Sequence, residues 1–169
     1  MKIAILGYSG SGKSTLAQFL GEKKRLPVIH LDTVQFIENW QERNHAEALV
    51  IVSDVMGQKN WVIDGNYTKF YQAERLEEAD QIIFLQFSRW ASFKRIIHRR
   101  IKYHNKTRPD MAEGCDEKLD FEFLWWVLYT GRTKERRAHY RELQEKYPSK
   151  SVVIKNQKEL DAFYQQNQS

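Results

Sequence analysis

The sequence predicts a three-layer α/β/α fold around a five-stranded parallel sheet. Short apolar runs typical of buried strands alternate along the chain with longer segments whose apolar residues recur at helical spacing. The first apolar run leads into a glycine-rich loop and then into a helical segment. A chain of 169 residues is long enough for one substantial core. We therefore expect a single domain over residues 1–169.

The glycine-rich loop carries the most specific motif of the chain. Gly7-Tyr8-Ser9-Gly10-Ser11-Gly12-Lys13-Ser14-Thr15 fits G-x-x-x-x-G-K-[ST], the P-loop or Walker A pattern. The preceding residues 1–6 are mostly apolar, which indicates a buried strand, and the residues that follow are apolar at helical spacing. In such a loop the backbone N–H groups cradle phosphate oxygens at the start of a helix. The alternative is a glycine-rich turn that binds nothing.

The motif assigns roles to individual side chains. Lys13 can reach the β- and γ-phosphates of a nucleotide, and the hydroxyl of Ser14 can ligate Mg²⁺. The residues expected to contact the nucleotide are Gly7, Ser9, Gly10, Ser11, Gly12, Lys13, Ser14 and Thr15. A P-loop NTPase fold is therefore the expected architecture.

A second strand is predicted at residues 26–32, with Asp32 at its end. Ligands of open parallel sheets bind beyond the carboxyl ends of the strands, so Asp32 would lie near the phosphates. We expect it to bind a Mg²⁺-bound water or a substrate hydroxyl; the alternative is a helix N-cap. In residues 33–43 the apolar residues do not recur at a regular spacing, whereas residues 44–56 predict a helix. We expect the segment 33–59 to cover the substrate.

A third strand is predicted at residues 61–67, which contain Asp64 and Gly65 near their end. An acid after an apolar strand resembles the second acidic element of P-loop enzymes, which holds Mg²⁺ directly or through water. Gly65 would let the backbone approach a substrate closely. The alternative is an ordinary exit from a strand, with Asp64 forming a turn.

The next segments bring arginines toward this edge of the sheet. Residues 76–79 close a short helix, 80–87 form the fourth predicted strand, and 90–103 form a helix. Arg95 and Arg99 are four residues apart on that helix, so a bound anion would relieve their repulsion; the alternative is a solvated basic face. The polar residues 103–120 contain Arg108 and predict a lid loop.

The C-terminal part completes the alternation of strands and helices. The aromatic residues 121–129 predict a packed helix, which we favour over a base-stacking platform. An arginine-rich helix is predicted at 133–147, a fifth strand at 151–154 and a last helix at 157–166.

Composition narrows the class of protein. The formal net charge of +5 suits an anionic ligand and gives weak support to nucleic-acid binding. Cys115 is the only cysteine, which excludes an intrachain disulfide and a cysteine-based zinc site. No apolar run reaches the length of a membrane span, and the sequence begins directly with the first predicted strand. We expect a cytoplasmic protein without a signal peptide and without membrane contact.

The motifs together resemble the adenylate-kinase-related small-molecule kinases. The resemblance rests on the P-loop, on Asp64-Gly65 after the third strand, and on the arginine-bearing helix and lid. More narrowly, the chain is similar to the bacterial topology modulation (FlaR-type) proteins. This narrower likeness covers nearly the whole chain and rests, besides the P-loop, on His30-Leu31-Asp32, Trp61-Val62-Ile63-Asp64-Gly65-Asn66-Tyr67, Ala79-Asp80-Gln81-Ile82-Ile83-Phe84-Leu85, Arg108-Pro109-Asp110 and Gly114-Cys115.

The resemblance implies an ATP-dependent phosphotransferase with a core sheet, a substrate-binding helical segment and a helical lid. Asp64-Gly65 matches the start of the Asp-Gly-Phe-Pro-Arg segment of adenylate kinases, but Asn66-Tyr67-Thr68 replaces the rest. The substrate-gripping arginine of that segment is therefore missing, which argues against AMP as the acceptor. With Cys115 as the only cysteine, the zinc-binding lid of some adenylate kinases is excluded.

The resemblance also assigns the arginines. Arg95 and Arg99 match the pair that enters the lid, and Arg108 with Arg132 or Arg136 matches the pair that leaves it. These side chains would close over the transferring group and offset its negative charge.

The leading hypothesis is transfer of the γ-phosphate of ATP to a small acceptor: a nucleotide, a nucleoside or another hydroxylated metabolite. The expected catalytic residues are Lys13, Asp32, Arg99 and Arg108. The expected nucleotide site adds Arg95 and Arg99 to the P-loop, and the expected metal ligands are Ser14 and Asp64. The expected substrate site consists of Asp32, Gly65, Asn66, Arg132 and Arg136.

Two other hypotheses compete with this one. A nucleotide-dependent regulatory protein that acts on nucleic acid is supported by the basic stretch from Arg89 to Arg141, but the sequence lacks a zinc-finger or RNA-recognition motif. A GTPase switch is disfavoured because Asn105-Lys106-Thr107-Arg108 lacks the acid of the guanine-reading Asn-Lys-x-Asp motif. The sequence favours a small-molecule kinase over both.

Overall fold

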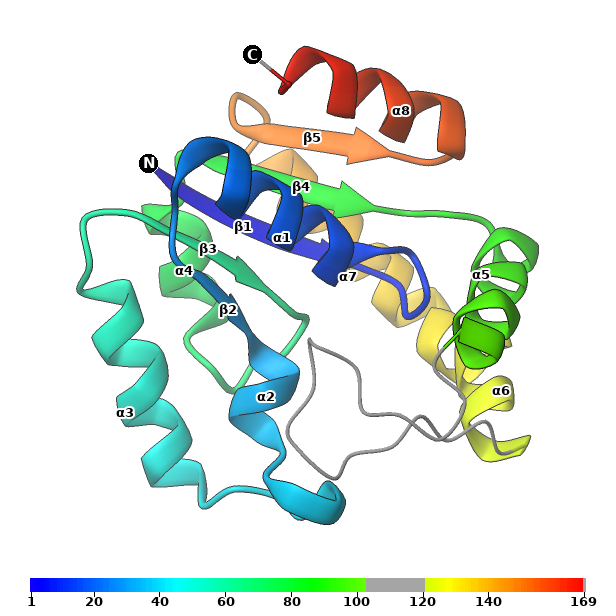
Figure 1. Cartoon of the computed structure of the whole chain (residues 1–169), viewed down its shortest axis with the longest axis horizontal. Helices are drawn as coiled ribbons and strands as arrows, with labels where there is room; N and C mark the ends of the chain where they lie inside the picture. Colours follow the sequence, from blue (N-terminus) through cyan, green and yellow to red (C-terminus); the bar gives the residue numbers. More distant parts are fainter. Residues whose placement is uncertain (103–120, 169) are drawn as a thin grey trace.

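The computed structural model describes residues 1–102 and 121–168, apart from the side chains of 99–102 and 121–123. Within this part, five strands form one parallel sheet in the order β2-β3-β1-β4-β5 (Figure 1). The strands are β1 (Lys2–Gly7), β2 (Val28–His30), β3 (Trp61–Asp64), β4 (Gln81–Leu85) and β5 (Ser151–Ile154). In the register of the sheet, Asp64 pairs with Ile5 on one side and with His30 on the other. The carboxyl ends of β1, β2 and β3 therefore meet at one edge.

Helices connect the strands and cover both faces of the sheet. The α-helices are α1 (Lys13–Lys24), α2 (Leu31–Gln35), α3 (His45–Met56), α4 (Gln72–Glu78), α5 (Arg89–Lys102), α6 (Phe121–Leu128), α7 (Lys134–Lys146) and α8 (Gln157–Gln166). Two 3₁₀ turns, η1 (Glu38–Trp40) and η2 (Thr130–Arg132), lie between them. None of the described helices is long and apolar enough to cross a bilayer.

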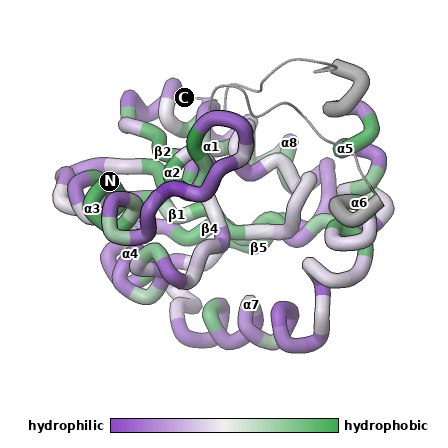
Figure 2. The backbone as a smooth tube through the Cα atoms, turned by 90° about the horizontal axis from the view of Figure 1, so that it is seen from below, coloured by the Kyte–Doolittle hydropathy of each residue, from purple (hydrophilic) through white to green (hydrophobic). Residues whose placement is uncertain are grey.

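The alternation of side chains along β1 divides the core into two parts. Ile3 and Ile5 belong to the cluster with α1 and α8, whereas Ala4 and Leu6 belong to the cluster with α3, α4 and α7. Successive side chains of a strand point to opposite faces, so one strand contributes to both clusters. Figure 2 shows α1 and α7 on opposite sides of the sheet. The predicted three-layer α/β/α architecture is thereby confirmed.

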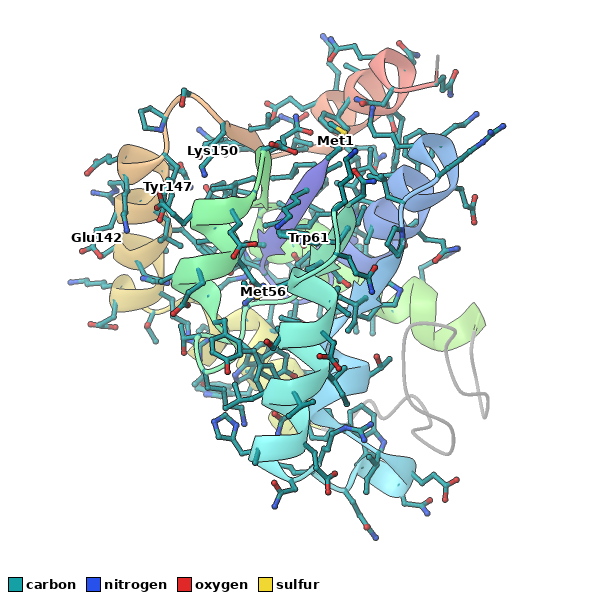
Figure 3. All side chains as sticks on the ribbon, turned by 90° about the vertical axis from the view of Figure 1, so that its left-hand side faces the viewer. Met1, Met56, Trp61, Glu142, Tyr147 and Lys150 are labelled. Carbon is teal, nitrogen blue, oxygen red and sulfur yellow. The ribbon has the colours of Figure 1, made fainter. Side chains whose placement is uncertain are left out.

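At the amino ends of the strands, on the edge of the sheet away from the P-loop, the contacts hold the fold together. Met56 at the end of α3 and Trp61 at the start of β3 lie in the same core cluster (Figure 3). Lys2 on β1 donates to the carbonyl of Met56 at 3.2 Å and pairs with Glu78 at 2.7 Å. These contacts join α3, α4 and the sheet at the edge opposite the predicted site.

Most predicted elements lie within a few residues of the observed ones, but the second strand differs. It ends at His30, and Asp32 lies in the first turn of α2 rather than on the strand. The hydroxyl of Thr33 donates to the carbonyl of His30 at 2.8 Å, which favours the immediate turn. Past α2 the chain forms an isolated antiparallel bridge between Phe36 and Glu42. The predicted lid loop at 103–120 lies outside the described residues.

Candidate active site

The P-loop passes from the end of β1 to the start of α1 and packs against α5. Gly10 has φ of 72°, a conformation that L side chains rarely adopt. A Cβ at this position would lie 2.7 Å from the side chain of Ile96 and 2.9 Å from the carbonyl of Ser92. Both the backbone conformation and the contact with α5 therefore require glycine at position 10.

Asn66 fixes the beginning of the P-loop. The N–H of Gly7 donates to Oδ1 of Asn66 at 3.0 Å, and Nδ2 of Asn66 donates to the carbonyl of Gly7 at 2.7 Å. The hydroxyl of Tyr140 on α7 donates to the same Oδ1 at 3.0 Å. The Asn66 amide, expected to bind substrate, thus bonds to the P-loop and to α7. It joins three elements that are far apart in the sequence.

The two residues predicted to hold the metal lie side by side. The hydroxyl of Ser14 donates to Oδ2 of Asp64 at 3.1 Å, and Nδ1 of His30 lies 2.5 Å from Oδ1 of the same carboxylate. Because a carboxylate only accepts hydrogen bonds, Nδ1 of His30 is the donor. Asp64 is 4% exposed, so these contacts hold it in a fixed orientation.

The chemistry of this pair fits Mg²⁺. Hydroxyl and carboxylate oxygens are the hard ligands that Mg²⁺ prefers, and it usually keeps several waters and substrate phosphates in its shell. Nowhere in the described residues do three or more His, Cys, Asp or Glu side chains gather as a metal site. The cation would therefore be held by Ser14 and Asp64 together with phosphate oxygens and water.

Asp32 lies beside the loop that follows β3. Its Oδ1 accepts a hydrogen bond from the hydroxyl of Tyr67 at 2.7 Å, and its side chain is partly exposed. Burial raises the pKa of Tyr67, and the charge of Asp32 raises it further, as do Glu42 and Asp64. Tyr67 is therefore a neutral donor that orients the carboxylate of Asp32.

A buried arginine supports the loop between Asp64 and α4. Arg75 is fully buried and donates to the carbonyls of Phe70 at 2.8 Å and Tyr67 at 2.9 Å. Burial lowers the pKa of Arg75 to about 10, partly opposed by the charge of Asp64. Gly65, at φ of 137°, leaves room for Leu31, whose Cβ would lie 2.7 Å from an added Cβ. The close approach at Gly65 is thus made by α2.

Two of the predicted cations donate hydrogen bonds to backbone carbonyls of the P-loop. Nζ of Lys13 donates to the carbonyl of Tyr8 at 3.3 Å. NH1 of Arg95 on α5 donates to the carbonyl of Ser11 at 2.5 Å, and its NH2 bonds to Gln157 at the start of α8. Burial lowers the pKa of Arg95. Of the lid arginines, the side chain of Arg99 is not described and Arg108 lies outside the described residues.

Arg132 and Arg136 occupy different environments. Arg132 is 6% exposed. Its three guanidinium nitrogens bond to Val127 O at 3.0 Å, Phe87 O at 2.7 Å and Ser92 Oγ at 2.6 Å. Its guanidinium carbon lies 4.1 Å from the centre of the Tyr8 ring, so it reaches the P-loop. Arg136 is exposed, with its guanidinium carbon 5.7 Å from the centre of the Trp126 ring.

A cavity of about 250 Å³ lies next to Tyr8, the second residue of the P-loop. It is lined by Tyr8, Gln86, Phe87, Ser88, Arg89, Arg132 and Arg137. Sequence reasoning did not assign Arg89 or Arg137 to a site. The available signal for Arg137 was its position three residues before Tyr140 on the same helix, which makes the two residues neighbours on the helix surface; the side chain of Arg137 itself is exposed. A second hollow of about 510 Å³ begins at Thr15 and runs between α1 and α8.

Comparison with known proteins supports the fold and the general class. No protein-family model matches the chain. An adenylate kinase from Clostridium kluyveri is 25% identical over 151 residues, which cover 69% of this chain and 70% of the relative. The fold is that of a shikimate kinase from Acinetobacter baumannii solved with shikimate: the TM-score is 0.61 and the identity 19%, over 98% of this chain and 89% of that one.

A candidate kinase from Chloroflexus aurantiacus has the same fold, with a TM-score of 0.54 and 14% identity over 97% of this chain and 94% of that one. The two solved structures support the fold, and the similarity to the adenylate kinase supports the general class of P-loop kinases. They leave the acceptor unspecified, and they do not distinguish the narrower FlaR-type group.

Proposed function

We propose that this protein transfers the γ-phosphate of ATP to a hydroxyl of a small acceptor: a nucleotide, a nucleoside or another hydroxylated metabolite. The observation that carries the proposal is the 3.1 Å contact between Ser14, at the start of α1, and Asp64, at the end of β3. It joins the two residues that we propose as Mg²⁺ ligands, one of which belongs to the P-loop. The similarity to an adenylate kinase supports this class of reaction. Within this class, the FlaR-type group is our narrower assignment.

On the nucleotide side, the P-loop and Lys13 would bind the phosphates of ATP. Arg95 and Arg99 would contact the nucleotide from α5. Ser14 and Asp64 would hold Mg²⁺, which when bound neutralises charge on the β- and γ-phosphates. His30 would hold the carboxylate of Asp64 in its orientation through the 2.5 Å contact between Nδ1 of His30 and Oδ1 of Asp64.

On the acceptor side, Asp32 would orient the attacking hydroxyl and accept its proton, with Tyr67 holding the carboxylate at 2.7 Å. We propose that residues 33–59 cover the substrate and that 103–120 act as a lid. Arg99, Arg108 and Arg136 would then offset charge on the transferring group, and water would be excluded. Gly65, Asn66 and Arg132 would act by shaping this site, through their contacts with Leu31, Gly7 and Tyr8.

The test is transfer of label from γ-labelled ATP, with Mg²⁺, to a panel of nucleoside monophosphates, nucleosides and small hydroxylated metabolites. We expect one acceptor class to raise ADP release far above the rate without acceptor, with label in the product. Lys13→Ala should reduce transfer about 100-fold or more, in the range of removing a charge-stabilising donor. Lys23→Ala is the matched control, because Lys23 is an exposed lysine at the far end of the same helix.

Two results would count against the proposal. Full turnover in Lys13→Ala would show that the P-loop does not act as assigned. A flat panel with ATP still bound would favour an ATP-binding regulatory protein over a kinase.

A further inference from the structure

The cavity beside Tyr8 has the composition of an anion site. Three separate segments line it: the P-loop, residues 86–89 between β4 and the start of α5, and the η2–α7 region. Its volume of about 250 Å³ greatly exceeds the roughly 30 Å³ share of one water in the liquid. A small polyatomic group can therefore enter it.

The charges around the cavity are all of one sign. Arg89, Arg132 and Arg137 line it, and none of its lining residues is acidic. No salt bridge in the described part of the chain involves these three arginines. Burial lowers the pKa of Arg132, and the nearby charge of Arg89 lowers it further. Three cations around one cavity repel one another, and an anion between them would remove that cost.

One of the three arginines is already held in place. The guanidinium of Arg132 has five N–H donors, of which its three hydrogen bonds use three, so two remain for a ligand. The side chain is 6% exposed and packs on the ring of Tyr8. Arg89 and Arg137 are exposed and can adjust to a bound group. A fixed buried donor with two adjustable cations is a built site rather than a solvated basic face.

Neutral donors complete the lining. Gln86 and Ser88 contribute an amide and a hydroxyl, and Tyr8 stays protonated because burial raises its pKa, although Arg132 and Arg137 oppose the shift. Lys13 and Ser14, which would hold the ATP phosphates and Mg²⁺, do not line the cavity. The cavity is therefore distinct from the expected site of the ATP phosphates, although Tyr8 of the P-loop lines it.

We propose that this cavity binds a phosphate group in addition to those of ATP. The group is either the phosphate monoester of the acceptor or free inorganic phosphate. The first source rests on the proposed kinase function and would make the acceptor a phosphorylated metabolite; the second does not depend on it.

The experiment measures phosphate binding by calorimetry to the full chain, with Mg²⁺ and a non-hydrolysable ATP analogue saturating the P-loop. We expect one phosphate to bind per chain. Arg137→Gln and Arg89→Gln should each weaken binding about tenfold, as expected for loss of a charge-assisted hydrogen bond. Arg141→Gln, which removes the same charge one turn further along α7, should change the affinity less than about twofold, as for a screened exposed charge.

A matched pair of ligands, a nucleoside and its monophosphate, distinguishes the two sources in the same assay. Displacement of phosphate by the monophosphate and not by the nucleoside, lost in Arg137→Gln, assigns the site to the acceptor. Binding of phosphate without competition from the monophosphate assigns it to the free anion. No phosphate binding with the P-loop filled, or equal affinity in all three arginine variants, overturns the proposal.

The two proposals fail separately. Phosphate binding that persists when no acceptor is phosphorylated would contradict the kinase assignment and leave the phosphate site intact. If the chain binds no second phosphate and labelled transfer is unaffected by Arg89→Gln and Arg137→Gln, the phosphate site is contradicted and the kinase assignment stands.

Discussion

Asp64 and Asp32 lie at the same edge of the sheet, but their surroundings differ. Asp64 is the last residue of β3, is 4% exposed and accepts hydrogen bonds from Ser14 and His30. Asp32 lies in the first turn of α2, is partly exposed and accepts a hydrogen bond from Tyr67. A carboxylate held by two donors beside the P-loop suits a fixed metal ligand. A more open carboxylate with a neutral donor suits contact with an exchanging acceptor.

The comparison shows that two aspartates with the same carboxylate group can serve different roles, because the local fold gives them different neighbours and exposure. Asp64 ends a parallel strand and Asp32 lies two residues beyond one, and the sequence left open which of them serves the metal. The difference comes from the helix that starts at once after His30, which moves Asp32 away from the strand end. We assign Asp64 to the metal and Asp32 to the acceptor, and the following predictions test that division.

The largest effect is expected for Asp64→Asn. The substitution keeps the shape of the side chain but removes the charge that would bind Mg²⁺, so we expect kcat/KM to fall about 1,000-fold, at the upper end for loss of one charge-stabilising group. The Mg²⁺ concentration needed for half-maximal rate should rise as well. Steady-state kinetics over a Mg²⁺ titration check this. An unchanged Mg²⁺ dependence would remove Asp64 from the metal site.

Asp32→Asn should act on a different parameter. Loss of a general base costs at least about 100-fold in rate, so kcat should fall by that factor. ATP affinity and the Mg²⁺ midpoint should stay near their original values, because the hydrogen bond of Asp32 is made with Tyr67 and not with Ser14 or Asp64. Single-turnover transfer and ATP-analogue binding on the same variant separate the two effects. A shift of the Mg²⁺ midpoint equal to that of Asp64→Asn would contradict the division of roles.

The sequence was sufficient for most of the helices and strands and for the proximity of Ser14 and Asp64. Strand and helix periods are local signals, and the parallel sheet places strand ends together whatever their order. Ser14 and Asp64 could therefore be predicted to meet although 50 residues separate them. The order of the strands in the sheet and the start of α2 depend on packing between segments. The spacing of apolar residues within one segment carries no information about that packing.

Contacts between side chains were harder to predict. Asn66 was predicted to bind substrate, and the sequence did not show that its amide forms hydrogen bonds with both the N–H and the carbonyl of Gly7. Arg132, Arg89 and Arg137 come from different elements and meet at one cavity only in the folded chain. Composition showed the excess of positive charge, but it did not show which charges converge.

A smaller effect is expected from the residue that orients Asp64. His30→Ala removes a donor 2.5 Å from the carboxylate, and we expect the Mg²⁺ midpoint to rise about tenfold, as for other residues behind a metal ligand. His30→Asn places an amide donor in a similar position and should recover most of the affinity. Kinetics at several Mg²⁺ concentrations compare the two. Equal defects in both variants would indicate a packing role instead.

The smallest effect on activity is expected from Tyr67→Phe, which removes the hydrogen bond to Asp32. We expect kcat to fall about fivefold, since a hydrogen bond to a charged group contributes roughly 1.5–3 kcal/mol and water can replace part of it. Because Tyr67 is partly exposed, water can reach the carboxylate that loses its donor. Steady-state kinetics on the best acceptor check this, and a loss as large as that of Asp32→Asn would make Tyr67 itself a catalytic residue.

The same variant has a stability signature at alkaline pH. Burial raises the pKa of Tyr67, and Asp32 raises it further, so the folded chain keeps a proton that the unfolded chain loses near pH 10. The contribution of Tyr67 to stability is therefore complete below about pH 10 and declines as the pH rises above it. Tyr67→Phe should lose less of its thermal midpoint between pH 8 and roughly pH 11 than the original chain does. Tyr129→Phe is the control, because Tyr129 is 49% exposed. Parallel pH curves for the original chain and Tyr67→Phe would mean that Tyr67 is less buried in solution than its contact with Asp32 implies.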